Sequence, residues 1–292
     1  MKTLRLLGGL VLATQFASMA AFAQLPKNYG SWTAEQKVDF LWNKKLVPSA
    51  WNQLPPIGGT GWEGLWKSAQ AAFSLSESFD HDSDEMPRDR PKIFHPSGSV
   101  AQFEFIADEN TPYAGVLAGS VGLVRFSLGA DPKTFGGYLP GMALKFMLDG
   151  RPSVNVHLLN SIEGQGDDHN LFARPLSNEL PEPNSLAFRF ILKSLKSLLG
   201  LDPLHVSLDH LSPPLAPHRL IFVPASGVST SSNSEHDFRE DLTQIPAGIC
   251  LYEVYAQATE ADAFKHMGRM MLKTPFVASQ YGDEQLFFRH RR

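Results

Sequence analysis

The sequence predicts an α+β fold in which a closed antiparallel β-barrel is flanked by helices. Short runs of apolar and β-favouring residues recur between 100 and 159, and again between 218 and 272. Turn residues separate these runs, and the Asp149-Gly150 pair between two of them is a hairpin signal. The first four runs follow one another at regular intervals with no helical stretch between them, which indicates an antiparallel sheet or barrel.

The first 23 residues are predicted to be a signal peptide. Lys2 and Arg5 precede a mostly apolar run, and Ala21-Phe22-Ala23 is a small-x-small site, so we expect cleavage after Ala23. The run is too short for a stable membrane-spanning helix. We therefore expect an exported protein, periplasmic or secreted, with no membrane span after cleavage. The formal charge of −4 would become −6, which opposes nucleic-acid binding.

Composition is that of one ordinary globular domain, since 43% of the 292 residues are hydrophobic and 19% are charged. Residues 24–90 are predicted to form an N-terminal helical arm. Thr33 and Gln36 form a capping box, and Val38, Leu41 and Trp42 then recur at helical spacing. A second helix is expected at 62–73, and the acidic stretch 81–85 is expected to be a solvated loop rather than a calcium site.

Residues 91–292 are predicted to form the barrel, with an inserted helix near 185–200. In that helix Leu192, Leu195 and Leu199 are in register, and Gly200 is suited to the position just beyond its end. Cys250, the single cysteine, lies in an apolar run and is expected to be a small buried hydrophobe. The sequence contains no pattern typical of a zinc site or a serine hydrolase. A homo-oligomer is compatible with the sequence.

Three short motifs point to one chemistry when they are taken together. They are Lys92-Ile93-Phe94-His95-Pro96-Ser97-Gly98, Val124-Arg125-Phe126-Ser127, and Pro140-Gly141-Met142-Ala143-Leu144-Lys145-Phe146. Their order and spacing resemble the front half of the barrel of haem catalases. The resemblance covers about 92–160 well and about 218–288 loosely.

The resemblance implies a haem cofactor and a peroxide substrate. His95 would be the distal histidine that moves a proton between the peroxide oxygens, and the hydroxyl of Ser127 would accept a hydrogen bond from it. Arg125 and Lys92 would pair with haem propionates. Asn155 or His157, which the sequence does not separate, would polarise the peroxide. Phe172 would lie over the macrocycle, inside the closed sheet.

The sequence differs from haem catalases in the motif that supplies the iron ligand. Haem catalases bind iron through a tyrosinate in the pattern R-x-x-x-Y, which this chain lacks. The iron ligand is therefore unknown; Tyr281 is a candidate, as are Tyr138, Tyr252 and Tyr255. The leading hypothesis is an exported haem protein acting on hydrogen peroxide or an organic hydroperoxide. The alternative is a catalytically inactive barrel of this kind that binds an apolar ligand, or a protein partner through its Trp-rich arm.

Overall fold

The computed structural model describes most of the barrel and of the arm. Its described residues are 25–55, 84–86, 92, 95–109, 111, 117, 119–129, 139–160, 170–179, 186–199, 208, 217–231, 233 and 236–289. The predicted signal peptide, the helix expected at 62–73 and Tyr138 lie outside them. Within the described part of the chain, no helix has the length and hydropathy of a membrane-crossing segment.

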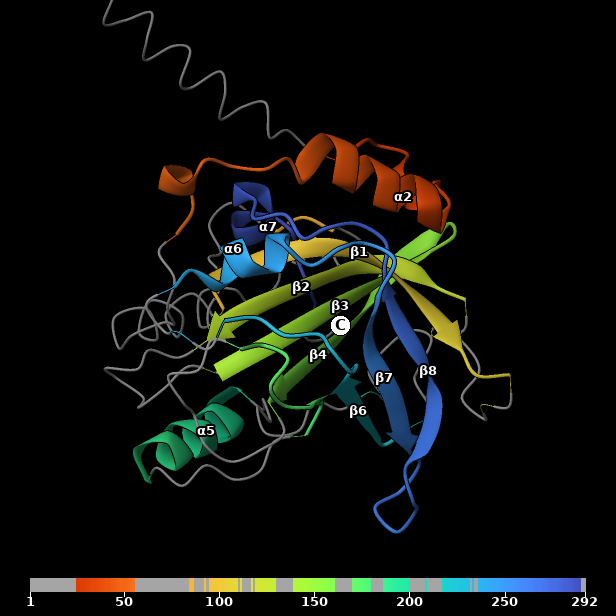
Figure 1. Ribbon diagram of the computed structural model, residues 1–292, viewed down its shortest axis with the longest axis vertical. Helices are drawn as coiled ribbons and strands as arrows, with labels where there is room; N and C mark the ends of the chain where they lie inside the picture. The colour runs from red at the N-terminus through yellow and green to blue at the C-terminus, as the bar shows by residue number, and fades with distance from the viewer. Residues whose placement is uncertain are drawn as a thin grey trace, which may run out of the picture.

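Eight strands form a closed barrel in which each strand pairs with its sequence neighbour and β1 pairs with β8, so the predicted antiparallel barrel is confirmed. The strands are β1 (Ser97–Ala107), β2 (Val121–Gly129), β3 (Leu139–Leu148), β4 (Arg151–Asn160), β5 (Leu176–Ser177), β6 (Arg219–Pro224), β7 (Cys250–Gln257) and β8 (Lys265–Leu272). Figure 1 shows β1 to β4 as one continuous wall, with β6, β7 and β8 forming the opposite side.

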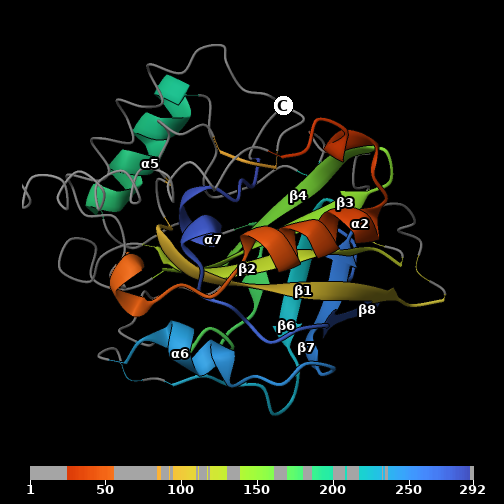
Figure 2. The same cartoon turned by 90° about the horizontal axis from the view of Figure 1, so that it is seen from above.

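Short helices flank this barrel. They are η1 (Tyr29–Ser31), α2 (Ala34–Phe40), η2 (Leu41–Lys45), η3 (Trp51–Gln53), α5 (Leu186–Leu199), α6 (Phe238–Thr243) and α7 (Gln280–Glu284). In both views α2 and α7 lie over the outside of the β1–β2 wall, whereas α5 stands apart from the strands (Figures 1 and 2). The inserted helix is thus confirmed. The helices α6 and α7 were not predicted.

Local sequence explains how α2 begins and how its first turn is attached to the β3–β4 hairpin. The capping box is confirmed: Thr33 Oγ1 accepts from the backbone N–H of Gln36, and Gln36 Oε1 accepts from that of Thr33. The β3–β4 hairpin turns at Asp149-Gly150, where Gly150 has a φ of 60° that favours glycine. Asp149 Oδ1 accepts from the N–H of Ala34, which ties the first turn of α2 to this hairpin.

Two apolar cores lie on opposite sides of the β1–β4 wall. The larger fills the barrel and includes Phe103, Phe126 and Phe146. The smaller packs Tyr29, Val38, Leu41 and Leu46 of the arm, with Tyr281 and Phe288, against the outside of the wall. The arm segment around α2 is therefore part of the core of this protein.

Candidate functional site

Side chains of β2 alternate between the two faces of the wall. Val124, Phe126 and Leu128 belong to the core inside the barrel. Arg125 and Ser127 alternate with them and point to the outside, so the two share a face as predicted. Leu123, which has the same parity, packs in the outer core with α2.

Aromatic side chains fill the interior of the barrel. The ring of Phe126 lies 5.2 Å from that of Phe172, 6.0 Å from Tyr252 and 5.5 Å from Phe276, measured between centroids. Phe103 and Phe146 pack edge to face at 5.1 Å. Because Arg125 and Ser127 point outward, away from these rings, the predicted site residues do not gather inside the closed sheet as expected.

The strand register places the predicted polar residues together on the outer face of the wall. Ser127 pairs with Gly141, Arg125 with Ala143, and Ala143 in turn with His157. One row further along, Lys145 pairs with Asn155. Directly paired residues of an antiparallel sheet point to the same side. Phe172 lies in the core on the other side of the wall, so it and His95 do not face one plane.

His95 precedes β1 and packs on this outer face against Gly141. A Cβ atom at Gly141 would stand 2.7 Å from Cε1 of His95, so only glycine leaves room for the ring. The pKa of His95 is lowered to about 3, chiefly by burial and also by the charges of Arg125 and His157, while an interaction with the backbone of Ser127 opposes the shift. The imidazole is therefore neutral, and its Nδ1 has no hydrogen-bond partner among the described residues.

Both terminal nitrogens of Arg125 bind protein groups, whereas its Nε is buried without a hydrogen-bond partner among the described residues. Nη2 lies 2.6 Å from Oδ1 of Asp283, and both side chains are buried. Nη1 and Nη2 donate to the carbonyl oxygens of His95 and Pro96 at 3.0 and 3.2 Å. Asp283 thus occupies the position that the resemblance gives to a propionate, and the same guanidinium fixes the backbone that carries His95.

Lys92 and Asn155 contribute buried polar atoms without partners in the described part of the chain. They are Nζ of Lys92 and Oδ1 of Asn155. Burial lowers the pKa of Lys92 well below its usual range, Arg125 adds to this effect and Asp283 opposes it. Because an unsatisfied buried polar atom is costly, a polar partner at either atom would be stabilising.

His157 differs from Asn155 in having a partner. Its Nε2 lies 3.0 Å from the backbone oxygen of Arg289, and Arg289 also donates to the carbonyl of Ser153 at 2.7 Å. The C-terminal segment therefore covers His157. Of the two alternatives, Asn155 is the residue with an unsatisfied side-chain oxygen.

A second buried network lies on the same face and was not predicted. Lys145 Nζ donates to Oδ1 of Asp84 at 2.8 Å, and the hydroxyls of Ser153 and Tyr29 donate to the same carboxylate at 2.7 and 2.6 Å. Burial raises the pKa of Asp84, but the charge of Lys145 and these hydrogen bonds outweigh it, so the pKa is lowered. Asp84 is 3% exposed, so the solvated loop expected there is wrong at this residue.

Tyr281 is a poor iron ligand in this arrangement. Its hydroxyl donates to Oε1 of Glu85 at 3.1 Å, and Lys45 lies over its ring. Burial, together with Glu85 and Asp84, raises its pKa well above the usual value. A tyrosinate ligand requires the opposite shift. Burial also raises the pKa of Tyr252, which lies inside the barrel, well above the usual value.

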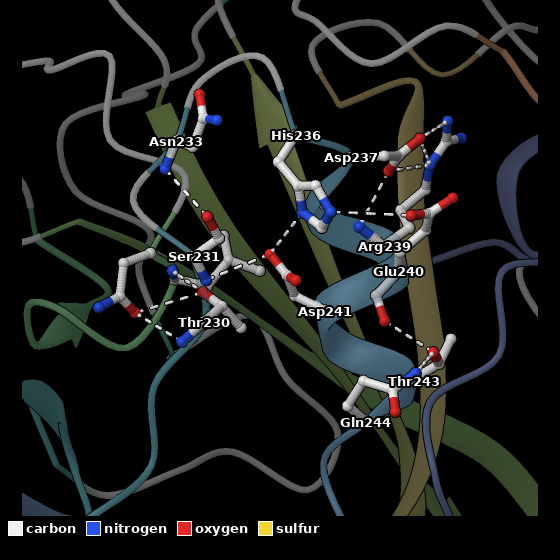
Figure 3. A network of polar contacts seen from close by, with 12 residues as sticks. Thr230, Ser231, Asn233, His236, Asp237, Arg239, Glu240, Asp241, Thr243 and Gln244 are labelled. Atoms are coloured by element: carbon white, nitrogen blue, oxygen red, sulfur yellow. Dashed lines mark hydrogen bonds and ion pairs between the residues drawn. The ribbon is translucent and has the colours of Figure 1, made fainter.

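A polar network connects α6 to the residues that precede it in the chain, Ser231 and His236. Asp241 accepts from the N–H of Ser231 at 3.1 Å and lies 3.1 Å from Nδ1 of His236 (Figure 3). Arg239 pairs with Asp237, donates to the carbonyl of Pro55 and lies 3.9 Å from Oδ2 of Asp283. Asp237 also caps α6 by accepting from the backbone N–H of Arg239, and the side chain of Arg239 connects the helix to the Arg125–Asp283 pair.

No group of three or more His, Cys, Asp or Glu side chains within the described ranges is placed to hold a metal ion. Cys250 is half-buried, and burial with the nearby Glu253 raises its pKa, which keeps the thiol protonated. Haem does not fit these residues as expected: Asp283 already pairs with Arg125, and burial raises the pKa of Tyr252 and of Tyr281, which disfavours a phenolate ligand at either residue.

Comparison with known proteins assigns the chain to no family. No protein-family model matches the chain, and a search of curated proteins finds no match.

Proposed function

We propose that this protein is an exported β-barrel related to the haem catalases that does not turn over peroxide and acts as a binding protein. The observation that carries the proposal is the buried Arg125–Asp283 pair, whose N–O distance is 2.6 Å. An internal carboxylate there neutralises the guanidinium, so a propionate would have to displace a charge that is already buried and paired.

The barrel interior argues against an apolar ligand as the bound molecule. Phe126, Phe172 and Tyr252 fill its centre with rings in mutual contact. The proposed binding role therefore belongs to the outer surface of the protein, and not to the lumen.

An absorption spectrum tests the absence of haem. We expect purified protein, with and without added haem, to show no ferric Soret band near about 400 nm and no peroxide turnover. A known haem protein taken through the same reconstitution is the positive control. A stoichiometric Soret band together with turnover would overturn the proposal.

The second candidate is a haem-dependent enzyme acting on hydrogen peroxide or an organic hydroperoxide. It is favoured by the unsatisfied Nδ1 of His95 and Oδ1 of Asn155, which share one buried face. Its iron ligand would have to be a residue other than Tyr252 and Tyr281, because burial raises the pKa of both hydroxyls. In that case His95→Ala would abolish turnover and leave haem content largely unchanged, whereas His236→Ala in the loop before α6 would change neither.

A further inference from the structure

Helix α5 has an unusual composition for a helix on an acidic protein. Its sequence, Leu-Ala-Phe-Arg-Phe-Ile-Leu-Lys-Ser-Leu-Lys-Ser-Leu-Leu, carries Arg189, Lys193 and Lys196 and no acidic residue. The protein as a whole has a formal charge of −4. The helix therefore carries three positive charges and no negative one, in a molecule whose overall charge opposes attraction to anionic surfaces.

Two large apolar side chains of α5 are exposed. Leu186 is 80% exposed and Phe190 is 74% exposed, the two highest values among the exposed large apolar residues of the described chain. They are four residues apart, so they lie one above the other on the helix, and Lys193 follows on the same side. In Figures 1 and 2 α5 stands apart from the strands of the barrel.

Exposed Leu and Phe next to lysine fit a bilayer surface with negative headgroups. The apolar side chains would enter the boundary between headgroups and acyl chains, and the ammonium group would remain with the phosphates. With 14 residues, α5 is about 21 Å long at ~1.5 Å per residue, which is shorter than a hydrocarbon core of about 30 Å. A helix of this length lies in the plane of the membrane surface and does not cross it.

We propose that α5 docks the protein on anionic lipid surfaces, with Leu186 and Phe190 inserted and Lys193 pairing with lipid phosphate. The inference goes beyond the proposed function, because it names a surface and a partner that do not depend on the residues around His95.

Co-sedimentation of the full chain with vesicles tests this docking. We expect binding to vesicles of phosphatidylcholine with phosphatidylglycerol, weaker binding to phosphatidylcholine alone, and loss of binding at high salt. Phe190→Ser should weaken binding roughly tenfold to a hundredfold, as expected from the burial of one large apolar side chain. Lys193→Glu should weaken it about fivefold or more.

Matched controls separate this face from general surface effects. Ile106→Ser removes an apolar residue that is 43% exposed on the barrel, and Lys44→Glu makes the same charge change on the arm. Both should bind vesicles as the wild type does. Equal loss in the controls, or no binding of the wild type, would overturn the proposal.

A contact between copies of this chain is the rival use of the same face. Self-association that Phe190→Ser abolishes, in wild-type protein that ignores vesicles, would assign α5 to that contact and overturn the lipid proposal. The absorption spectrum tests the absence of haem, and co-sedimentation tests docking on lipid. The two measurements are independent, so either proposal can fail without the other.

Discussion

The Arg125–Asp283 pair is a single contact on which the geometry around His95 depends. We expect Asp283→Asn to lower the free energy of unfolding by about 3–5 kcal/mol, because it leaves the guanidinium buried without its counter-charge. Chemical denaturation measures this loss. The exposed pair Lys273–Glu104, with side chains 50% and 38% exposed, is the control: Glu104→Gln should change stability by about 1 kcal/mol or less. Equal effects of the two substitutions would contradict the assignment.

His266 joins three elements on the opposite side of the barrel. Its Nδ1 bonds Asp108 after β1, its Nε2 lies 2.7 Å from Oε2 of Glu253 on β7, and the ring of Tyr255 packs against it. The hydrogen bond to Asp108 raises the pKa of His266, burial opposes this, and the bond to Glu253 adds to it. Cys250, also near Glu253, stays a neutral thiol in this setting.

The raised pKa predicts that stability depends on pH. The protonated His266 is favoured in the folded state, so its contribution is complete below the ordinary value of 6.5 and is lost as pH rises through the higher folded value. Denaturation of the wild type and of His266→Gln at a series of pH values measures the difference between them. That difference should be largest at acidic pH and shrink at alkaline pH; a difference that grew with pH would contradict the assignment.

At the scale of elements, the arm around α2 acts as part of the core. Leu41 is fully buried in the outer core, and Lys37 Nζ donates to the carbonyls of Leu148 and Arg151 at the β3–β4 hairpin. A detachable docking arm would bury neither group. The Trp-rich segment around α2 is therefore unsuited to serve as a free docking arm for a protein partner.

Truncation of one arm residue checks this. We expect Leu41→Ala to cost about 2–5 kcal/mol of unfolding free energy. Val47→Ala, at a residue that is 52% exposed a few positions later, should leave stability nearly unchanged. If Leu41→Ala proved as mild as the control in thermal unfolding, the arm would not be part of the cooperative unit.

At the scale of the molecule, the barrel was predictable because its strands are long runs separated by clear turns. The two-residue β5 was not, since it lies in a polar stretch rich in Gly and Pro and is too short to show a period. The sequence also did not show whether the site lies on the inner or the outer face of the barrel wall. All residues of β2 after Val121 are buried, so no alternation between polar and apolar residues distinguishes the two faces.

Site residues were predictable only where a local motif contained them. His95, Arg125 and Ser127 came from such motifs, and Asn155 from the resemblance. The register places Arg125, Ser127 and Asn155 on one face, and His95 packs there against Gly141. The pairing of Lys145 with Asp84 joins residues 61 positions apart, and no local pattern indicates it. The same is true of Asp283 and Arg125, which are 158 positions apart.

The position of Asp283 and Arg289 in the chain has a consequence for biogenesis. A polypeptide that has emerged only as far as Leu272 already contains all eight strands, but it lacks the carboxylate that pairs with Arg125 and the segment that covers His157. In such an intermediate the guanidinium of Arg125, which is buried in the folded protein, would be exposed to water on the outer face of the wall. Vectorial synthesis therefore postpones completion of the native state until α7 and the segment after it have appeared.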